Sequence, residues 1–422
     1  MLNKIKGLFN GGFFHILGSS FINKCIAFLS NIGLVRILSK NDYGVFTGAF
    51  NAYYIVYLFS GLGITSGILY FCSKDITREE KKTYYRYALR FGFVFETLLS
   101  LALILHGLFG NVGIEETRVH IISLAGMPFV AYLFDFFSIV LRAEKSNKKY
   151  SWLLNIHSVL YAGLAIFGAV ISGITGTIIG RYLSYLIAGI IGMKFCKEYY
   201  EPFWKKKLER DKVKDLRLYS LKAGITSALN VILYRLDVMV ITVVVADATI
   251  LAAYKTGTQL PENLNFIPQC MMIYYIPLFV QQLKNVDWIK RKTKEIYLFV
   301  GSVSVFLGII VYIFAPQIVT LLWGANYLDS VPCMRILTIS FVILSTFRVT
   351  STNLLLSLKR AGYTMFISII TGLANIGLDV WLTLKYGSIG AAYATLAVTI
   401  MAAVLSFPYV IYIVYSGKKS YE

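Results

Sequence analysis

Twelve apolar stretches, each long enough to cross a lipid bilayer, divide this 422-residue chain. A spanning helix needs about 20 predominantly apolar residues, because its backbone groups must be hydrogen-bonded within the segment. Runs rich in Leu, Ile, Phe and Ala are typical of helices, whereas barrel strands are shorter and alternate. The sequence therefore predicts an all-α polytopic membrane protein of about 12 transmembrane helices. The predicted spans are residues 11–38, 44–72, 88–110, 119–142, 152–172, 175–196, 217–245, 249–283, 296–322, 333–357, 364–385 and 389–415.

The composition excludes the other classes of protein. The chain is 57% hydrophobic and 15% charged, with a mean hydropathy of +0.65, whereas soluble domains carry about 25% charged residues. This excludes a soluble enzyme, and the 15% aromatic residues and aperiodic glycines exclude a disordered chain, a coiled coil and a collagen-like fibre. The N-terminus has a basic start but runs into a long apolar stretch without a small-residue cleavage site, which predicts a retained first helix.

The cysteines form neither a metal-binding nor a disulfide pattern. They are widely spaced, with no C-x-x-C motif and no histidine at ligand spacing. We therefore expect no metal and no cofactor. The five positions are Cys25, Cys72, Cys196, Cys270 and Cys333.

Lysine and arginine gather at alternate ends of the predicted spans. One side carries 31 of the 41 basic residues, and the opposite loops hold little beyond Lys40, Arg118 and Lys385. Because cytoplasmic loops are enriched in these residues, both termini are expected in the cytoplasm. The net charge of +19 then reflects topology, and nucleic acid is not an expected partner.

The chain is predicted to consist of two halves of six helices each. The expected divisions are an N-terminal bundle at 1–197, a cytoplasmic linker at 198–215 and a C-terminal bundle at 216–422. The surrounding charged segment 194–222 is expected to form an interfacial helix, with Phe203, Trp204 and Leu208 against lipid.

The two halves show weak similarity at a period of about 210–215 residues. LRAEKSNKKYSW (141–152) matches LSLKRAGYTMF (356–366), and DYGVF (42–46) matches AAYKT (252–256). GITGTIIGRYLSYLIAGIIG (173–192) matches GSIGAAYATLAVTIMAAVLS (387–406). Since each half has six helices, the repeats are expected to be parallel and pseudo-symmetric, and transporters place their sites between such halves.

Two segments resemble a known family. LVRILSKNDYGVF (34–46) joins two apolar helices through a polar turn and Tyr-Gly, and LDVMVITVVVADATILAAY (236–254) is its counterpart in the second half. Both resemble the bacterial polysaccharide transporters, the Wzx-type oligosaccharide flippases of the multidrug/oligosaccharidyl-lipid/polysaccharide exporter superfamily. The resemblance implies two six-helix bundles around a central cavity. It also implies movement of an undecaprenyl-pyrophosphate-linked oligosaccharide from the cytoplasmic to the outer leaflet of the bacterial cytoplasmic membrane. The expected partners are this lipid-linked oligosaccharide, membrane lipids, a glycan polymerase and glycosyltransferases.

Ionisable side chains inside the predicted spans are candidate site residues, because each costs about 2.5–3.5 kcal/mol unless it faces a bundle interior or a wet cavity. Lys24 and Arg235 lie in the first helix of each half, at corresponding depths. For a lipid pyrophosphate, arginine supplies two parallel donors and lysine a point charge. The alternative is that each cation neutralises a nearby acid, as Lys255 would neutralise Glu262. The cations are Lys24, Arg181, Arg235, Lys255 and Arg348, and the acids are Glu96, Asp135, Asp237, Glu262 and Asp379.

Polar residues also gather in the predicted span 249–283, around Pro261 and Pro268. Proline removes a helical hydrogen bond, so a kinked or broken helix is expected here. Gln259 and Asn263 are candidate contacts for sugar hydroxyls along a hydrated path. The alternative is a static kink whose amides bond within the protein. The neighbouring polar residues are Glu262, Asn265 and Gln269.

Two other functions remain open from the sequence. An ion-coupled multidrug exporter of the same superfamily would bind a proton or sodium ion with core carboxylates, for which Asp237, Glu262 and Asp379 are candidates. Helix 1 carries Lys24 and no acid, which favours an anionic lipid substrate. A glycan polymerase or ligase is less consistent, because such enzymes need an extracytoplasmic catalytic loop and no exterior loop here exceeds about ten residues. No G-x-x-x-x-G-K-[ST] motif is present either. We therefore expect a transporter that is not an enzyme.

Overall fold

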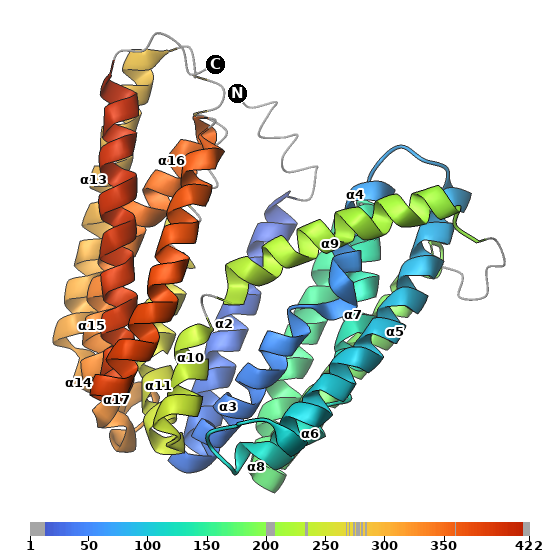
Figure 1. Ribbon diagram of the computed structural model, residues 1–422, viewed down its shortest axis with the longest axis horizontal. Coiled ribbons are helices and arrows are strands. Elements are labelled where there is room, and N and C mark those ends of the chain that lie inside the picture. The colour runs from blue at the N-terminus through green and yellow to red at the C-terminus, as the bar shows by residue number, and fades with distance from the viewer. Residues whose placement is uncertain are drawn as a thin grey trace. The chain divides into compact units, whose positions relative to one another are not determined.

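The computed structural model confirms the predicted all-α class, since every regular element in the residues it describes is a helix (Figure 1). Each of the twelve predicted spans overlaps one or more of these helices. The chain divides into two compact units, Met1–Arg235 and Leu236–Glu422. The described residues are 13–199, 207–232, 235–266, 268–269, 271–272, 275, 279, 282, 285–358 and 360–416.

Unit 1 is built around α7 and α8, which pack on each other and on helices from the rest of the unit. Tyr132 of α7 is fully buried and donates a hydrogen bond to the Ala88 carbonyl at 2.7 Å. A Cβ atom on Gly92 would lie 2.0 Å from the Tyr132 ring, so only glycine allows this ring to sit against α5. The elements of unit 1 are α2 (Phe13–Ile37), α3 (Lys40–Tyr57), η1 (Ser60–Gly63), α4 (Ile64–Cys72), α5 (Arg78–Phe109), α6 (Thr117–Ser123), α7 (Met127–Ala143), α8 (Asn147–Phe195) and α9 (Arg210–Ile232).

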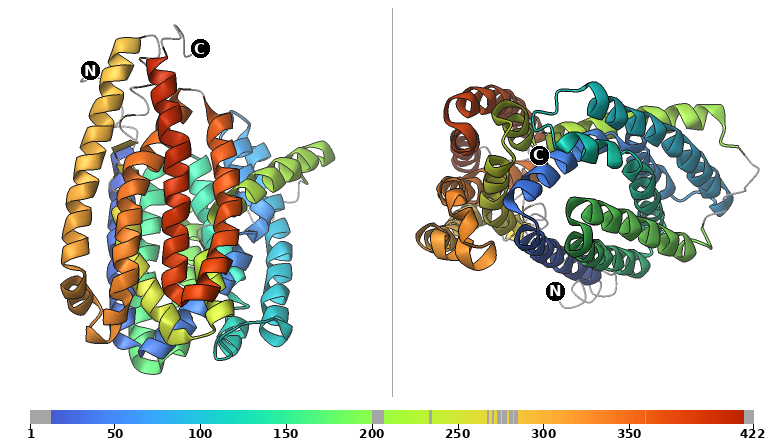
Figure 2. Two further views of the ribbon diagram at one scale, coloured as in Figure 1. Left: turned by 60° about the vertical axis from the view of Figure 1, so that its left-hand side comes forward. Right: turned by 90° about the horizontal axis from the view of Figure 1, so that it is seen from below.

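Unit 2 has its apolar core between α13, α16 and α17. Figure 2 shows the gold α13, the orange α15 and the red α17 side by side, and Ser340 on α15 donates to Thr399 on α17 at 3.0 Å. The elements are α10 (Leu236–Val240), the π-helical turn η2 (Ile241–Val245), α11 (Ala248–Leu264), α13 (Val286–Ile313), α14 (Ala315–Leu322), η3 (Ala325–Ser330), α15 (Val331–Ile343), the π-helical turn η4 (Leu344–Val349), α16 (Thr350–Ser357) and α17 (Ala361–Tyr415).

α8 and α17 are each two antiparallel arms. A straight helix of the 49 residues of α8 would be about 74 Å long, more than twice the hydrocarbon core. The chain instead reverses at Gly173 (φ 55°) and at Gly387 (φ 60°). The arms then approach so closely that a Cβ on Gly176 would lie 2.0 Å from the Gly168 carbonyl oxygen.

The second hairpin repeats this contact at the equivalent residues. A Cβ on Gly390 would lie 2.0 Å from the Leu382 carbonyl oxygen, and these two positions follow from Gly176 and Gly168 when residue 173 is aligned with residue 387. The hairpins therefore agree with the predicted matching of 173–192 and 387–406.

The predicted span 44–72 is interrupted in its middle. Gly61, Leu62 and Gly63 all have positive φ angles, of 51°, 50° and 75°. This conformation costs about 1–2 kcal/mol at Leu62, because the Cβ atom crowds the backbone. The break separates α3 from α4 and brings η1 against α9.

Two helices begin well before their predicted spans. α5 starts at Arg78, where Thr77 accepts a hydrogen bond from the Glu80 amide at 3.3 Å. α13 starts at Val286, capped by Asn285. These helices extend beyond the predicted spans because an apolar window detects only the part of a helix that can lie in hydrocarbon, and the first turns of α5 and α13 are charged.

The predicted linker segment lies partly outside the described residues. Phe203 and Trp204 fall there, while Leu208 is half-buried and packs against the core of unit 1. α9 packs on α4 and η1, so the division between the units falls after Arg235, downstream of the predicted linker 198–215.

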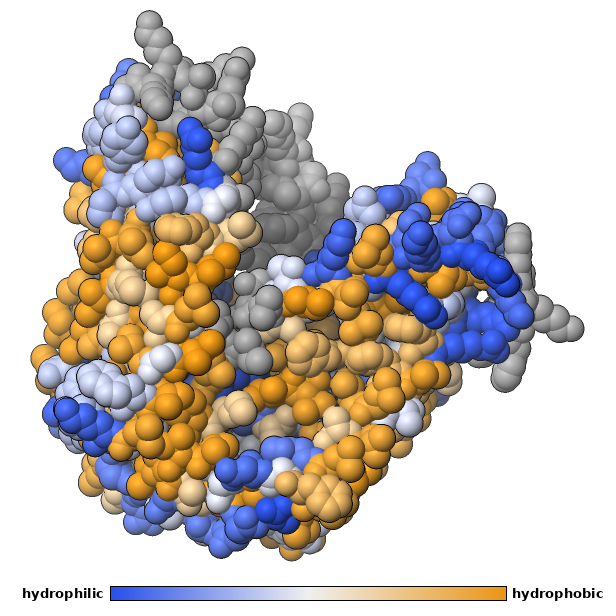
Figure 3. Space-filling view, in the orientation of Figure 1, coloured by the Kyte–Doolittle hydropathy of each residue, from blue (hydrophilic) through white to orange (hydrophobic). Residues whose placement is uncertain are grey.

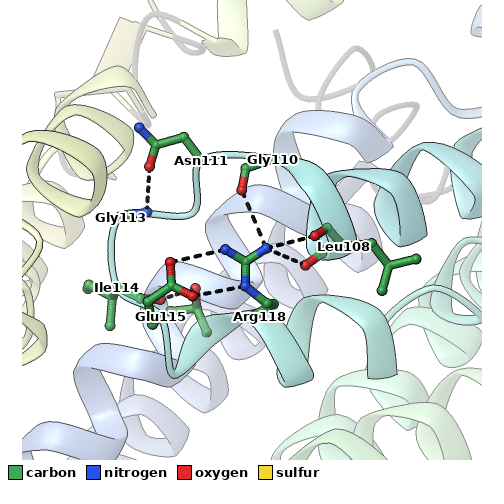
Figure 4. A network of polar contacts seen from close by, with 9 residues as sticks. Leu108, Gly110, Asn111, Gly113, Ile114, Glu115 and Arg118 are labelled. Carbon is green, nitrogen blue, oxygen red and sulfur yellow. Dashed lines mark hydrogen bonds and ion pairs between the residues drawn. The ribbon is translucent and has the colours of Figure 1, made fainter.

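A polar network closes the loop between α5 and α6 (Figure 4). Arg118 donates to both carboxylate oxygens of Glu115, at 2.9 and 3.0 Å. Its remaining nitrogen donates to the carbonyls of Gly107 and Leu108 at 2.8 and 3.2 Å. The Arg118 side chain thus donates hydrogen bonds to carbonyl groups that have no partner within the last turn of α5.

The protein is a multi-pass membrane protein. Within the described residues, six helices are long and apolar enough to cross a membrane, and α6 with α7, bent by 48°, makes a seventh. Long apolar side chains cover the outside of the helices, including Phe109 at 81% exposure, and Figure 3 shows broad apolar surfaces on each unit. Apolar surface of this extent is typical of helices that contact lipid.

Candidate functional site

Two acidic side chains meet inside unit 2. Asp237 lies on α10 and Asp379 on the first arm of α17, and their carboxyl groups interact directly. The Asp237 carboxylate accepts hydrogen bonds from the Tyr254 hydroxyl at 2.7 Å and from the Thr395 hydroxyl at 2.9 Å. Asn375 donates to Asp379. The predicted ion-coupling candidates Asp237 and Asp379 therefore belong to one cluster.

Hydrogen bonds reach only some of the carboxylate oxygens of this acid pair. Asp379 is fully buried, and its Oδ1 atom accepts no hydrogen bond from a described residue. Two adjacent buried carboxylates repel each other, so the pair is stable when it shares a proton or holds a cation. The third candidate, Glu262, lies apart from them on the surface of α11, with 57% of its side chain exposed.

Unit 1 carries a buried cation at the position equivalent to Thr395. In the alignment of 173–192 with 387–406, Arg181 corresponds to Thr395. Arg181 is 5% exposed and makes no ion pair with a described residue. Its guanidinium lies over three aromatic rings, at 4.7 Å from Phe46, 4.2 Å from Phe50 and 4.4 Å from Tyr161.

The aromatic rings only partly replace water around Arg181. Each cation–π contact contributes about 2 kcal/mol when desolvated, but the Nε atom still has no hydrogen-bond partner among the described residues. The residue equivalent to Arg181 in unit 2 is thus neutral, but it contacts the acid pair, because Thr395 donates to Asp237.

The two cations that were expected at equivalent depths differ in their surroundings. Arg235 is half-buried in unit 1, with its guanidinium 4.4 Å from the Tyr54 ring, and its carbonyl accepts from Asn51 at 3.5 Å. Lys24 on α2 is exposed. An exposed ammonium is compatible with a position that faces a wet cavity, so the role of Lys24 stays a prediction.

Of the two remaining cations, one is neutralised within its own helix. Lys255 forms an ion pair with Glu262 at 3.1 Å, which is the alternative that the sequence had left open. Arg348 lies half-buried on the π-helical turn η4 and forms no ion pair with a described residue. Such turns are rare and concentrate at functional sites.

The polar segment around Pro261 is partly within the described residues. α11 continues through Pro261 and ends at Leu264, before Pro268. Gln259 is buried, and its carbonyl accepts from the exposed Asn263 at 2.7 Å. The helix therefore stops between the two prolines, and its amides bond partly within the protein.

A family model for polysaccharide biosynthesis proteins matches residues 9–283 of this chain. The chain belongs to this polysaccharide biosynthesis protein family. Membership confirms the resemblance inferred from residues 34–46 and 236–254. No curated protein sequence matches the chain significantly.

Solved structures share the fold of this family member at low sequence identity. An inward-facing multidrug resistance MATE family transporter of the MOP superfamily has a TM-score of 0.73 and 13% identity, covering 94% of this chain and 96% of its own. The lipid II flippase MurJ, in an inward closed conformation, has a TM-score of 0.72 and 16% identity, covering 93% of this chain and 86% of its own. A MOP superfamily transporter from Pyrococcus furiosus has a TM-score of 0.58 and 14% identity, covering 94% and 93%.

Sequence reasoning missed how the remaining two acids are held. Glu96 is fully buried and accepts from the Ser60 hydroxyl at 2.7 Å and from the Gly61 amide at 2.8 Å. Asp135 accepts from the Tyr57 hydroxyl at 2.7 Å. Both contacts occur beside the break at residues 61–63. In the sequence, only the two glycines indicate a turn at this place. These acids stabilise the interrupted helix of this family member.

Proposed function

We propose that this polysaccharide biosynthesis family member is a flippase that moves an undecaprenyl-pyrophosphate-linked oligosaccharide from the cytoplasmic to the outer leaflet. The main support is the charge inside each unit, with the buried cation Arg181 in unit 1 and the Asp237–Asp379 pair in unit 2. A lipid-linked glycan is anionic at its pyrophosphate and polar at its sugars. The fold is also that of the lipid II flippase MurJ.

The cations without acidic partners would bind the pyrophosphate. Arg181, Arg235 and Arg348 form no ion pair with a described residue, and a guanidinium binds phosphate through two parallel hydrogen bonds. Lys24 would meet the substrate as an exposed point charge. Lys255 is the weakest candidate, because Glu262 already neutralises it. Gln259 and Asn263 would contact sugar hydroxyls.

The acid pair would couple transport to an ion. A proton or a monovalent cation between Asp237 and Asp379 removes their repulsion, and Tyr254 and Thr395 hold the first carboxylate in place. In the alternating-access scheme of the superfamily, ion release on one side would favour the return of the empty protein. Both termini and the segment 194–222 would lie in the cytoplasm.

The acid pair also keeps one second function open. A multidrug exporter would use the same pair to expel cationic compounds, and the fold is shared with MATE transporters. A buried arginine such as Arg181 disfavours a cationic substrate in unit 1, which is why we rank this function below glycan transport.

Purified protein in proteoliposomes tests the proposal. A lipid-linked oligosaccharide placed in both leaflets becomes fully accessible to an external glycosidase only if the protein moves it across. We expect full cleavage with the wild-type protein and half cleavage with empty liposomes. Unchanged half cleavage, together with extrusion of a cationic dye, would assign the drug-exporter function instead.

A further inference from the structure

A groove of about 660 Å³ opens on unit 1 between α9, η1 and α5. Leu62 of η1 and Phe91 of α5 form its apolar floor, and Val213 and Leu221 of α9 extend it. This groove is separate from Arg181 and from the acid pair, and neither the proposed transport nor the family assigns it a role.

Three cations line one wall of the groove. Arg210, Lys214 and Arg217 are exposed and spaced by four and three residues, so they share one face of α9. None of them forms an ion pair with a described residue. Figure 3 shows hydrophilic side chains along this edge of the unit, next to apolar surface.

Two acids near α9 are engaged by another cation of the helix. Lys212, about 200° around the helix from Arg210, binds Glu80 at 2.7 Å and Glu209 at 3.4 Å. Asp211 and Asp215 lie about 100° and 140° from Arg210 and form no ion pair with a described residue. The wall of the groove therefore keeps its positive charge, which an anion from outside the protein can neutralise.

Two aromatic residues of α5 fix the orientation of the Arg217 side chain. Its guanidinium lies 5.5 Å from the Tyr87 ring and 5.0 Å from the Phe91 ring, and its Nε donates to the Tyr87 hydroxyl. The contacts fix the planar group at the border between the cationic wall and the apolar floor. A ligand that fits has an anionic head and an adjoining hydrocarbon chain.

We propose that this groove binds an anionic phospholipid, with its phosphodiester on Arg210, Lys214 and Arg217 and an acyl chain along Leu62 and Phe91. The charges are complementary, and the occupant is present wherever α9 meets a negatively charged leaflet. The bound lipid would hold α9 to α5. The inference depends on the chain spanning a membrane and not on the transported substrate.

Binding of short-chain lipids to the delipidated full-length protein in detergent tests the proposal. The probes are dioctanoyl phosphatidylglycerol and dioctanoyl phosphatidylcholine, and binding is followed by native mass spectrometry. The wild-type protein should bind the anionic lipid at least about tenfold more tightly. The triple variant Arg210→Gln, Lys214→Gln and Arg217→Gln should reduce this preference to less than about twofold.

A second triple variant controls for net charge. Lys290→Gln, Arg291→Gln and Lys294→Gln remove the same charge from α13 of unit 2 and should leave the preference unchanged. If the first triple variant is not monodisperse, Lys214→Glu alone, at an exposed position, should still weaken binding about tenfold.

Three results would overturn the proposal. The first is equal affinity of the wild-type protein for the two lipids, and the second is an equal loss of preference in both triple variants. The third concerns the triple variant of Arg210, Lys214 and Arg217. If this variant still binds phosphatidylglycerol but no longer binds undecaprenyl pyrophosphate, the groove belongs to the glycan carrier. Glycan transport is measured separately, so failure of this inference leaves the proposed function untouched.

Discussion

Gly63 of η1 and Gly224 of α9 meet backbone to backbone: a Cβ atom on Gly63 would lie 2.7 Å from the Gly224 Cα and 2.4 Å from the Ser220 carbonyl oxygen. The contact holds α9 directly on the break between α3 and α4. Gly63 also has a φ of 75°, so both its conformation and its surroundings require glycine.

Gly63→Ala should destabilise the protein by about 1–3 kcal/mol, because the new methyl group must push α9 away. Thermal unfolding in detergent should show a lower midpoint for this variant. Gly163→Ala is the control: its Cβ would meet no atom within 4 Å, and alanine favours the helix. Equal midpoints for Gly63→Ala and wild type would contradict the packing.

Neutralising either member of the acid pair should abolish ion coupling. In proteoliposomes, a sodium or pH gradient should accelerate the wild-type protein, and Asp237→Asn and Asp379→Asn should respond to neither gradient. Glu262→Gln removes an exposed carboxylate on α11 and should retain the response. A wild-type response in both aspartate variants would exclude the pair from coupling.

Arg181→Gln should prevent glycan export while the protein remains in the membrane at nearly normal abundance, because the substrate loses a charge contact. Arg181→Lys should retain part of the export, since it keeps the charge without the planar group. Arg335→Gln is a matched control: this arginine also stacks on a tyrosine, Tyr312, at 5.3 Å. Low abundance of Arg181→Gln with a normal rate per molecule would indicate a structural role.

The ion pair between Glu115 and Arg118 should contribute stability only when Glu115 is ionised. Hydrogen bonding to Arg118 lowers the pKa of Glu115 below its usual value. A lowered pKa means that the stabilisation is complete above the pKa of the unfolded chain, about 4.3, and is lost as the pH falls through the lower folded value. Wild type and Glu115→Gln should therefore differ in melting temperature at pH 7, and the difference should narrow as the pH falls below about 4.3. A difference that stays constant down to pH 3 would point to another cause.

Helix positions and the second-half hairpin could be predicted because they depend on local properties. Spanning length follows from apolar runs, and the equivalence of Gly173 and Gly387 follows from matched glycine-rich segments. Asp237 and Asp379 could be named as candidate site residues, since an ionisable residue within an apolar run can be recognised from the sequence alone.

Pairings between distant residues could not be predicted. Asp237 and Asp379 are far apart in the sequence, so only the packed helices show that they form one cluster. The aromatic surroundings of Arg181 require α3 and α8 to meet. The exposure of Lys24 depends on how α2 is rotated about its axis, which a helix that is apolar on most faces does not reveal.

The two helical hairpins also mark where extra mass can be attached for imaging. Near the base of each turn, at Gly176 and Gly390, no atom can be added between the arms. At the tips, by contrast, a Cβ on Gly173 or Gly387 would meet nothing within 4 Å. A small rigid protein inserted at either tip would inherit the orientation of two packed arms, and would give electron microscopy the fiducial that a helical membrane protein of 47.5 kDa otherwise lacks.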